Sequence, residues 1–243
     1  MFFIAFGVLA SLYAIFNPII PSVSNEIDIF EITHLVEYGL IGILAIIYAR
    51  KFDWKVEVFS KTYFSLGMAF LMLVAGLVTY YYNESFLKEP HFLTLSNIFF
   101  TLYYPFVIYY VAGNCLYFKR NLGIYQKVLL FSLPVVTMFF QGFFQLEEKG
   151  FLSSEDLISF PILALNPIAI AFAIMGVFIF RNSFLGLAWL FIAIGILLEG
   201  IGDFWYNLLE LFNLYSRTHP VQNFFHIGNM LIIYGLIKHR KII

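Results

Sequence analysis

The sequence has little charge and almost no cysteine. Only 12% of its 243 residues are charged, 61% are hydrophobic and 21% are aromatic, and the formal net charge is -1. A chain with so few charged groups cannot cover a water-soluble surface, which excludes an ordinary soluble domain. Basic residues with interleaved aromatics are absent, so nucleic acid is not an expected partner. The single cysteine, Cys115, excludes an intramolecular disulfide and any multi-cysteine metal centre.

Apolar runs of about 20 residues recur along the chain, and each could cross the hydrocarbon core of a bilayer as a helix. We therefore predict an all-α, polytopic membrane protein with about eight transmembrane helices, seven being the alternative count. Residues 1–243 are expected to form a single integral membrane domain with no soluble domain, in contact with the lipid bilayer. The expected helices are 1–21, 31–50, 62–82, 92–117, 125–145, 158–180, 183–206 and 222–237.

The basic residues predict how the chain lies in the membrane. Cytoplasmic loops of membrane proteins carry an excess of lysine and arginine. Of the fourteen basic residues, those in alternate loops and in the tail are Arg50, Lys51, Lys55, Lys61, Lys119, Arg120, Lys127, Arg181, Lys238, Arg240 and Lys241. This asymmetry predicts that both termini lie in the cytoplasm. We expect the protein in the plasma membrane of a prokaryote.

Three of the predicted helices carry pairs of polar residues at helical spacing. His34 and Glu37 are three positions apart, Glu199 and Asp203 are four apart, and both spacings place a pair on one helix face. His226 lies in the last predicted helix. The predicted topology puts all five at a similar depth in the outer part of the bilayer. Ionisable groups at such depth are costly unless paired, hydrated or bound to a cation, so they predict a functional site.

The chemistry of these side chains is that of a metal centre. Imidazole and carboxylate are ligands for transition metals such as zinc, iron or copper, so we predict one such ion. No HExxH or other signature motif accompanies them. The alternative is a structural lock, in which the acids hydrogen-bond to the histidines and hold the helices together. The predicted metal ligands are His34, Glu37, Glu199, Asp203 and His226, and the predicted ligand-binding residues are Trp205, Tyr206, His219 and Asn229.

Gly200 and Gly202 leave the end of the seventh predicted helix open to two interpretations. The helix could continue outward beyond the bilayer, or it could bend at the glycines. In the second case, residues 204–215 would lie along the outer interface and cover the pocket as a lid.

The last two predicted helices resemble part of a known class of membrane domain. The residues that carry the likeness are Asp203-Phe204-Trp205-Tyr206, Tyr215, His219-Pro220, Phe225 and Gly228. They resemble the final two helices of prokaryotic multi-helix membrane input domains that precede histidine kinases and cyclases. The resemblance implies a sensor, and the short tail after the last helix implies that output would need a partner.

The leading functional prediction is an outer-leaflet pocket that binds a metal or small ligand, in a sensor or in a membrane subunit of a larger complex. A membrane protein partner or a homo-oligomer would then be expected. One alternative is a metal-dependent membrane-embedded enzyme, hydrolase-like or oxidase-like, in which a carboxylate acts as general base toward metal-bound water. A second alternative is a cation- or proton-coupled transporter that uses Glu37 and Glu199.

Overall fold

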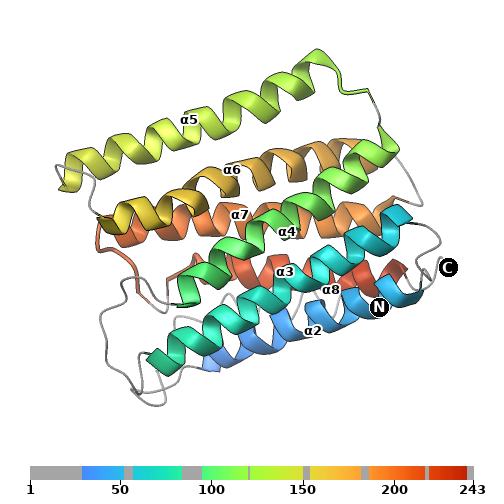
Figure 1. The fold of residues 1–243 in the computed structure, drawn as a ribbon, viewed down its shortest axis with the longest axis horizontal. Coiled ribbons are helices and arrows are strands. Elements are labelled where there is room, and N and C mark those ends of the chain that lie inside the picture. The colour runs from blue at the N-terminus through green and yellow to red at the C-terminus, as the bar shows by residue number, and fades with distance from the viewer. Residues whose placement is uncertain are drawn as a thin grey trace.

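The computed structural model describes residues 29–51, 57–83, 95–119, 121–149, 154–181, 186–216 and 219–239, and every regular element in these ranges is helical. The predicted first helix, 1–21, lies outside the described residues. The all-α prediction is confirmed for the part of the chain that the structure describes. With the labels of Figure 1, its helices are α2 (Ile29–Lys51), α3 (Glu57–Tyr82), α4 (Leu95–Phe118), α5 (Ile124–Lys149), α6 (Ser154–Phe180), α7 (Leu187–Leu211) and α8 (Gln222–His239).

Six of these helices, α2 to α7, are long and apolar enough to cross a membrane. The remaining described helix, α8, has 18 residues and carries Gln222, Asn223, His226 and Asn229 in its first half, which makes it less apolar. Large apolar side chains cover much of the outer surface, as on α5, where Phe131 and Phe139 are almost fully exposed. Such a surface is stable only against lipid or another protein, and the predicted class of helical membrane protein is confirmed.

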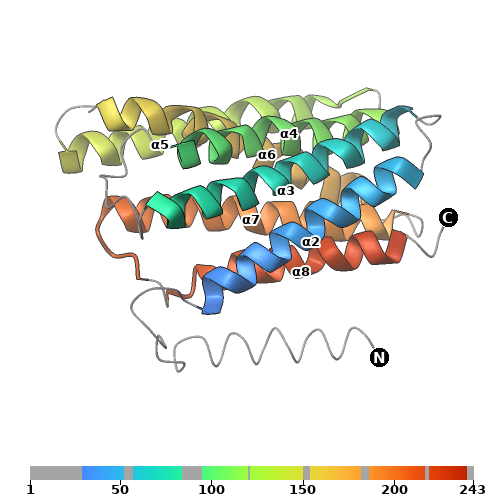
Figure 2. The same cartoon turned by 60° about the horizontal axis from the view of Figure 1, so that its bottom comes forward.

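Neighbouring helices close into a ring. In the described part of the chain α2 packs on α3, α3 on α4, α4 on α6, α6 on α7, α7 on α8, and α8 returns to α2. Helix α5 stands outside this ring and packs mainly on α6 (Figure 1). Figure 2 shows the same bundle turned, with α2 and α8 side by side along the edge opposite α5. The interior of the ring is therefore enclosed by helices on all sides.

Helices α7 and α8 run antiparallel and approach each other closely because glycines meet at their contact. A Cβ atom added at Gly195 would lie 2.6 Å from the carbonyl oxygen of Gly228, and one added at Gly228 would lie 2.9 Å from that of Gly195. Gly235 is crowded in the same way by Ile192. Small residues that let backbones approach drive helix association in membranes, where lipid removes the hydrophobic drive between helices. This close contact brings Glu199 of α7 against α8.

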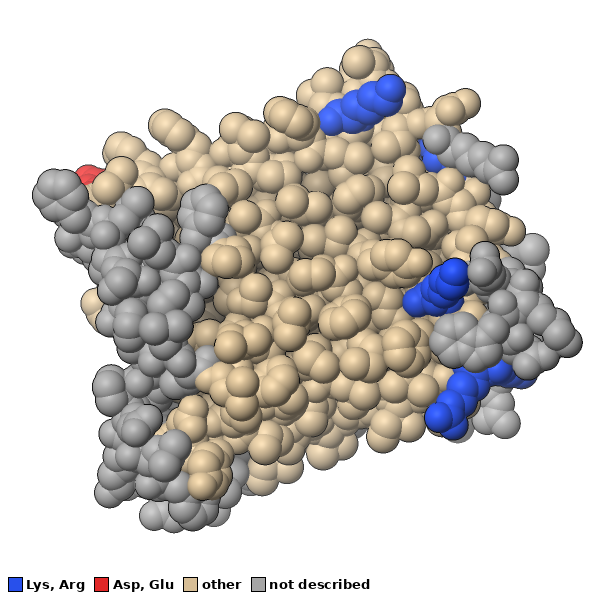
Figure 3. Space-filling model, in the orientation of Figure 1, with Lys and Arg blue, Asp and Glu red and all other residues tan. Residues whose placement is uncertain are grey.

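Basic side chains lie at the opposite end of the bundle from His34 and His226. The basic side chains that the structure describes are at the ends of helices on one side, and Figure 3 shows several of them gathered there. These residues are Arg50, Lys51, Lys61, Lys119, Lys127, Arg181 and Lys238. His34 and His226 lie in the second turns of α2 and α8, and both helices start at the other end. The polar interior is thus far from these seven basic side chains.

Helix α7 continues without a break through Gly200 and Gly202 to Leu211. Of the two alternatives for its end, the bend at these glycines is wrong, and so are the proposed lid geometry and the expected end at residue 206. The helix ends instead at a residue in the left-handed conformation that glycine usually adopts after a helix. Asn213 adopts a left-handed backbone with φ 55°, and Leu214 N donates to Leu209 O at 2.8 Å while Asn213 N donates to Glu210 O. This pair of bonds is the Schellman pattern that closes many helices.

Candidate functional site

Helices α2 and α8 run parallel, which places their polar residues in register. His34 faces Gln222, Glu37 faces His226 and Asn229, and Tyr48 faces His239 further along. Gln222, His226 and Asn229 are spaced four and three residues apart, so they form one stripe on the face of α8 that meets α2. The site is therefore the seam between two helices that are far apart in the sequence.

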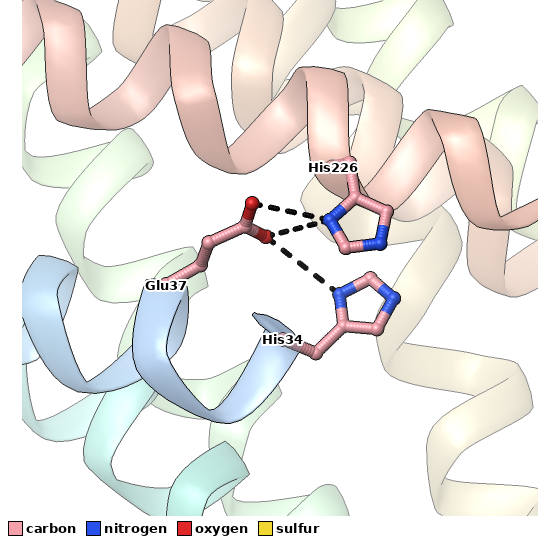
Figure 4. A group of neighbouring side chains, drawn as sticks. All are labelled: His34, Glu37 and His226. Carbon is pink, nitrogen blue, oxygen red and sulfur yellow. Dashed lines mark hydrogen bonds and ion pairs between the residues drawn. The ribbon is translucent and has the colours of Figure 1, made fainter. Parts of the chain in front are cut away.

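The carboxylate of Glu37 is the centre of this seam (Figure 4). Its Oε2 atom accepts hydrogen bonds from Nδ1 of His226 at 2.9 Å and from Nδ2 of Asn229 at 3.0 Å. Oε1 lies 3.1 Å from the same His226 nitrogen. All three residues are buried. A carboxylate that accepts several hydrogen bonds is stabilised in its ionised form, which offsets part of the cost of burying it.

His34 has a different role on each side of its ring. The amide of Gln222 donates from Nε2 to the hydroxyl oxygen of Tyr215 at 2.6 Å, so its Oε1 is the acceptor that faces Nε2 of His34 at 3.0 Å. A neutral His34 that donates from Nε2 to this oxygen carries its lone pair on Nδ1. That Nδ1 lies 3.8 Å from Glu37 Oε2, where a protonated ring would form an ion pair with the carboxylate.

The two imidazole rings lie one over the other. The ring centroids of His34 and His226 are 3.8 Å apart and the planes differ by 12°. Phe225 closes one side of His34, and Tyr38 stacks along its other side. The described His34, Glu37 and His226 offer ligand atoms that all lie within 4.8 Å of one another. Two nitrogens and one oxygen at this separation could hold a transition-metal ion.

A second polar group lies on α7, deeper between the helices. Glu199 is almost completely buried, and Asp203 follows it one turn later. The hydroxyl of Tyr104 on α4 donates to Asp203 Oδ2 at 2.6 Å, which joins two helices that α6 separates in the ring. Glu199 packs against Gly228 of α8, the residue next to Asn229, where an added Cβ atom would lie 3.3 Å from the Glu199 side chain. Glu199 and Asp203 therefore lie next to the Glu37 cluster but are not part of it.

The structure brings three of the five predicted metal ligands together and places the other two apart. His34, Glu37 and His226 come together, as the hypothesis of a shared pocket requires, and α8 packs on both α2 and α7. Glu199 and Asp203 lie outside that group of three. All five are at the same end of the bundle, in agreement with the depth argument.

The predicted ligand-binding residues surround this end of α8. Asn229 is part of the Glu37 cluster. His219 precedes Pro220, and its Nδ1 accepts a hydrogen bond from Val221 N at 3.2 Å, in the manner of a helix cap. Trp205 packs edge-on against His219, with ring centroids 5.4 Å apart. Tyr206 packs on Tyr215, which links it through Gln222 to His34. These residues fix the start of α8 over the cluster.

Several contributors were not predicted from the sequence. Gln222 orients His34, and its position four residues before His226 on the same face was a usable signal. Tyr103 and Tyr104 are both buried, and the hydroxyl of Tyr104 donates to Asp203. Asn166, beside Pro167 in the continuous helix α6, donates to Gly200 O at 3.1 Å. A run of tyrosines gives no sequence signal that separates lipid contact from hydrogen bonding.

Comparisons of the chain with protein families, with curated proteins and with solved structures find no match.

Proposed function

We propose that this membrane protein binds a transition-metal ion between α2 and α8, with His34, Glu37 and His226 as ligands. The observation that carries the proposal is the convergence of these three buried side chains, whose ligand atoms lie within 4.8 Å of one another. Zinc, iron and copper all accept imidazole and carboxylate ligands. The amide oxygen of Asn229 is a further donor, because Asn229 Oδ1 is buried and has no hydrogen-bond partner among the described residues.

An unpaired nitrogen of His34 supports a cation over a purely structural lock. In a lock, each buried polar atom would be expected to pair with a partner of opposite character. Here His34 Nδ1 lies 3.8 Å from the Glu37 carboxylate and makes no hydrogen bond with any described residue. A metal ion placed near these atoms would satisfy both of them. The other ring nitrogen of His34 faces Gln222, which in turn bonds to Tyr215, as metal-binding histidines are oriented by their outer partners.

Metal binding would require a local movement of one ring. A metal lies in the plane of the imidazole that binds it, but the two planes are stacked 3.8 Å apart. Rotation of either His34 or His226 about its side-chain bonds would turn its nitrogen toward a shared position. The Glu37 carboxylate already faces both rings (Figure 4).

The role that fits such a site is that of a sensor or of a metal-binding subunit. Its ligands come from two parallel helices, so occupancy would tie α2 to α8, and α8 is in turn packed tightly on α7. A ligand that binds one arrangement of helices better than another shifts the equilibrium between them. A metal could in this way change the contacts that the bundle offers to a partner in the membrane.

The test is elemental analysis of protein purified without chelator and supplied with zinc, iron or copper. Wild-type protein should retain stoichiometric metal after removal of the excess. His226→Phe keeps the ring volume but loses both nitrogens, and it should retain about tenfold less metal or lower. The matched control is His239→Phe, which replaces a buried histidine at the opposite end of α8. Wild-type protein that retains none of the three metals would overturn the proposal, and so would equal retention by the two variants.

A further inference from the structure

His34 contacts both the proposed metal site and the connection between α7 and α8. Its Nε2 atom lies 3.0 Å from Oε1 of Gln222, and the nitrogen of the same Gln222 amide donates to the hydroxyl of Tyr215 at 2.6 Å. Tyr215 lies in the connection between the two helices, and its ring packs on Tyr206 of α7, with centroids 4.7 Å apart. A chain of direct contacts therefore runs from the metal site to this connection.

The two histidines of the site differ in how they are directed at Glu37. Nδ1 of His226 is hydrogen-bonded to the Glu37 carboxylate at 2.9 Å, so this carboxylate lies near the plane of the His226 ring. Two ligand atoms of one tetrahedral ion are about 3.4 Å apart, so an ion could replace this hydrogen bond after a small shift. The His34 ring lies almost parallel to His226, with centroids 3.8 Å apart. His34 is therefore the ring that must turn to share the ion.

A turn of the His34 ring acts on both ends of the Gln222 amide. A histidine that binds a metal through one nitrogen usually keeps a hydrogen-bond partner on the other, and Gln222 is in the position of that partner. The amide group is planar and moves as one unit. A shift of its oxygen together with Nε2 of His34 therefore draws its nitrogen away from the Tyr215 hydroxyl.

Tyr215 belongs to a small apolar cluster that joins the end of α7 to the start of α8. The cluster has a buried part, against which two tyrosines pack, and its members are Leu209, Val221, Phe225, Tyr206 and Tyr215. Leu214, next to Tyr215, is exposed, so the connection reaches the surface of the protein. Loss of the bond to Tyr215 would therefore loosen this connection where a partner can contact it.

We propose that Gln222 is the positioning residue of the metal site, and that it communicates metal binding to the α7–α8 connection by giving up its bond to Tyr215. This inference rests on the proposed binding of a metal by His34, Glu37 and His226. Gln222 favours binding, because it supports the turned His34 ring. Tyr215 opposes binding, because its bond holds the Gln222 amide back. The two residues therefore have opposite effects on metal affinity.

Thermodynamic linkage gives the sign and the size of each effect. If metal binding breaks the bond to Tyr215, removing that bond beforehand must tighten metal binding. Tyr215→Phe keeps the ring but removes the hydroxyl, and it should lower the Kd for metal by about fivefold, the usual worth of one hydrogen bond. Gln222→Leu removes the partner of His34 and should raise the Kd by about tenfold or more. A purely structural role of both residues would not give changes of opposite sign.

The experiment titrates the purified full chain in detergent with Zn²⁺, Fe²⁺ or Cu²⁺, whichever ion the wild type retains, in competition with a chelator of known affinity. The matched control is Asn223→Leu. It removes an amide from the residue next to Gln222, and Asn223 Oδ1 makes no hydrogen bond with any described residue. This variant should bind the metal like wild type. Circular dichroism checks that every variant keeps its helices.

Hydrogen exchange of the backbone amides in residues 212–216 gives a second measurement that does not depend on affinity. In wild type these amides should exchange faster when metal is bound, because the bond that holds Tyr215 is lost. In Tyr215→Phe they should exchange at the faster rate both with and without metal.

Two results would overturn this inference and leave the metal site standing. One is a Kd that Gln222→Leu and Tyr215→Phe change in the same direction, or that neither variant changes. The other is hydrogen exchange in residues 212–216 of wild type that is the same with and without bound metal. A wild type that binds none of the three metals would instead overturn the proposed function, and this inference with it.

Discussion

The carboxylate of Glu37 and Nδ1 of His226 lie 2.9 Å apart although 189 positions separate the two residues in the chain. This contact joins the first described helix to the last and closes the ring of helices at its polar end. Asn229 adds a bond from the same face of α8. The pair is therefore both a structural link and the centre of the proposed metal site, and the two roles can be separated by experiment.

The first prediction concerns the strength of this link. Glu37→Gln and His226→Phe are combined in a double-mutant cycle, with unfolding free energies measured in metal-free detergent solution. An interhelical hydrogen bond in a membrane protein contributes about 1 kcal/mol, so we expect a coupling energy of that size. A cycle with no coupling would contradict the contact between the two side chains.

The same His226→Phe protein separates structure from binding. If His226 only joins helices, the loss should be about 1 kcal/mol and any effect of added metal on melting should remain. Our proposal predicts that the stabilisation by zinc, iron or copper disappears while the helical fold persists, because binding and folding are linked only through an intact site. Circular dichroism gives the fold, and melting with and without metal gives the linkage.

The second prediction concerns the bond between α4 and α7. Tyr104→Phe removes the hydroxyl that donates to Asp203 at 2.6 Å, and it should lower the unfolding free energy by about 1 kcal/mol. Tyr109→Phe is the control, since that side chain is half exposed on the outer face of the same helix. Equal stability of the two variants would mean that the Tyr104 bond contributes nothing.

The third prediction tests the close packing of α7 on α8. A Cβ atom at Gly195 would lie 2.5 Å from Ile232 and 2.6 Å from the backbone oxygen of Gly228. Gly195→Ala should therefore destabilise the bundle by about 1 to 3 kcal/mol, the usual cost of overpacking. Gly142→Ala on α5 is the matched control, because an added Cβ there meets nothing within 4 Å. It should be neutral or stabilising by about 0.5 to 1 kcal/mol, since alanine favours helix.

The fourth prediction is the orientation in the membrane. The described basic side chains lie at the end of the bundle opposite the polar cluster, which predicts that this basic end faces the cytoplasm. Single cysteines at Lys119 and Leu214, both exposed and at opposite ends, should label from the inside and from the outside respectively. The native Cys115 is buried and should label little. Labelling of position 119 from outside would reverse the predicted topology and the outer-leaflet placement of the site.

The class of fold could be predicted from composition and from the length of apolar runs, because a bilayer admits few solutions for such a chain. The start of α2 and the end of α3 follow closely from the pattern. The end of α7 could not be predicted from the pattern, because residues 207–211 lie beyond the apolar run. The Schellman cap at Asn213 closes it, and asparagine after a helix is a weak signal on its own.

The candidate site could be predicted in part. His34, Glu37 and His226 were found because ionisable groups in apolar helices stand out in the sequence. Their separation from Glu199 and Asp203 could not be predicted, since helical spacing gives the face within one helix but not how two helices are rotated against each other. The role of Tyr104 could not be predicted for the same reason. Its partner Asp203 lies 99 positions away, and only packing brings them together.

The central claim is that His34, Glu37 and His226 bind one transition-metal ion, and anomalous diffraction from metal-loaded crystals tests it most directly. Data collected at the absorption edge of the bound metal should show a peak between α2 and α8, with the two imidazole nitrogens and a Glu37 oxygen at about 2.0 to 2.2 Å. One imidazole should be rotated out of the stacked arrangement. Crystals grown with zinc, iron or copper that show no peak there, and in which Glu37 still bonds to His226 beside a stacked His34, would contradict the claim.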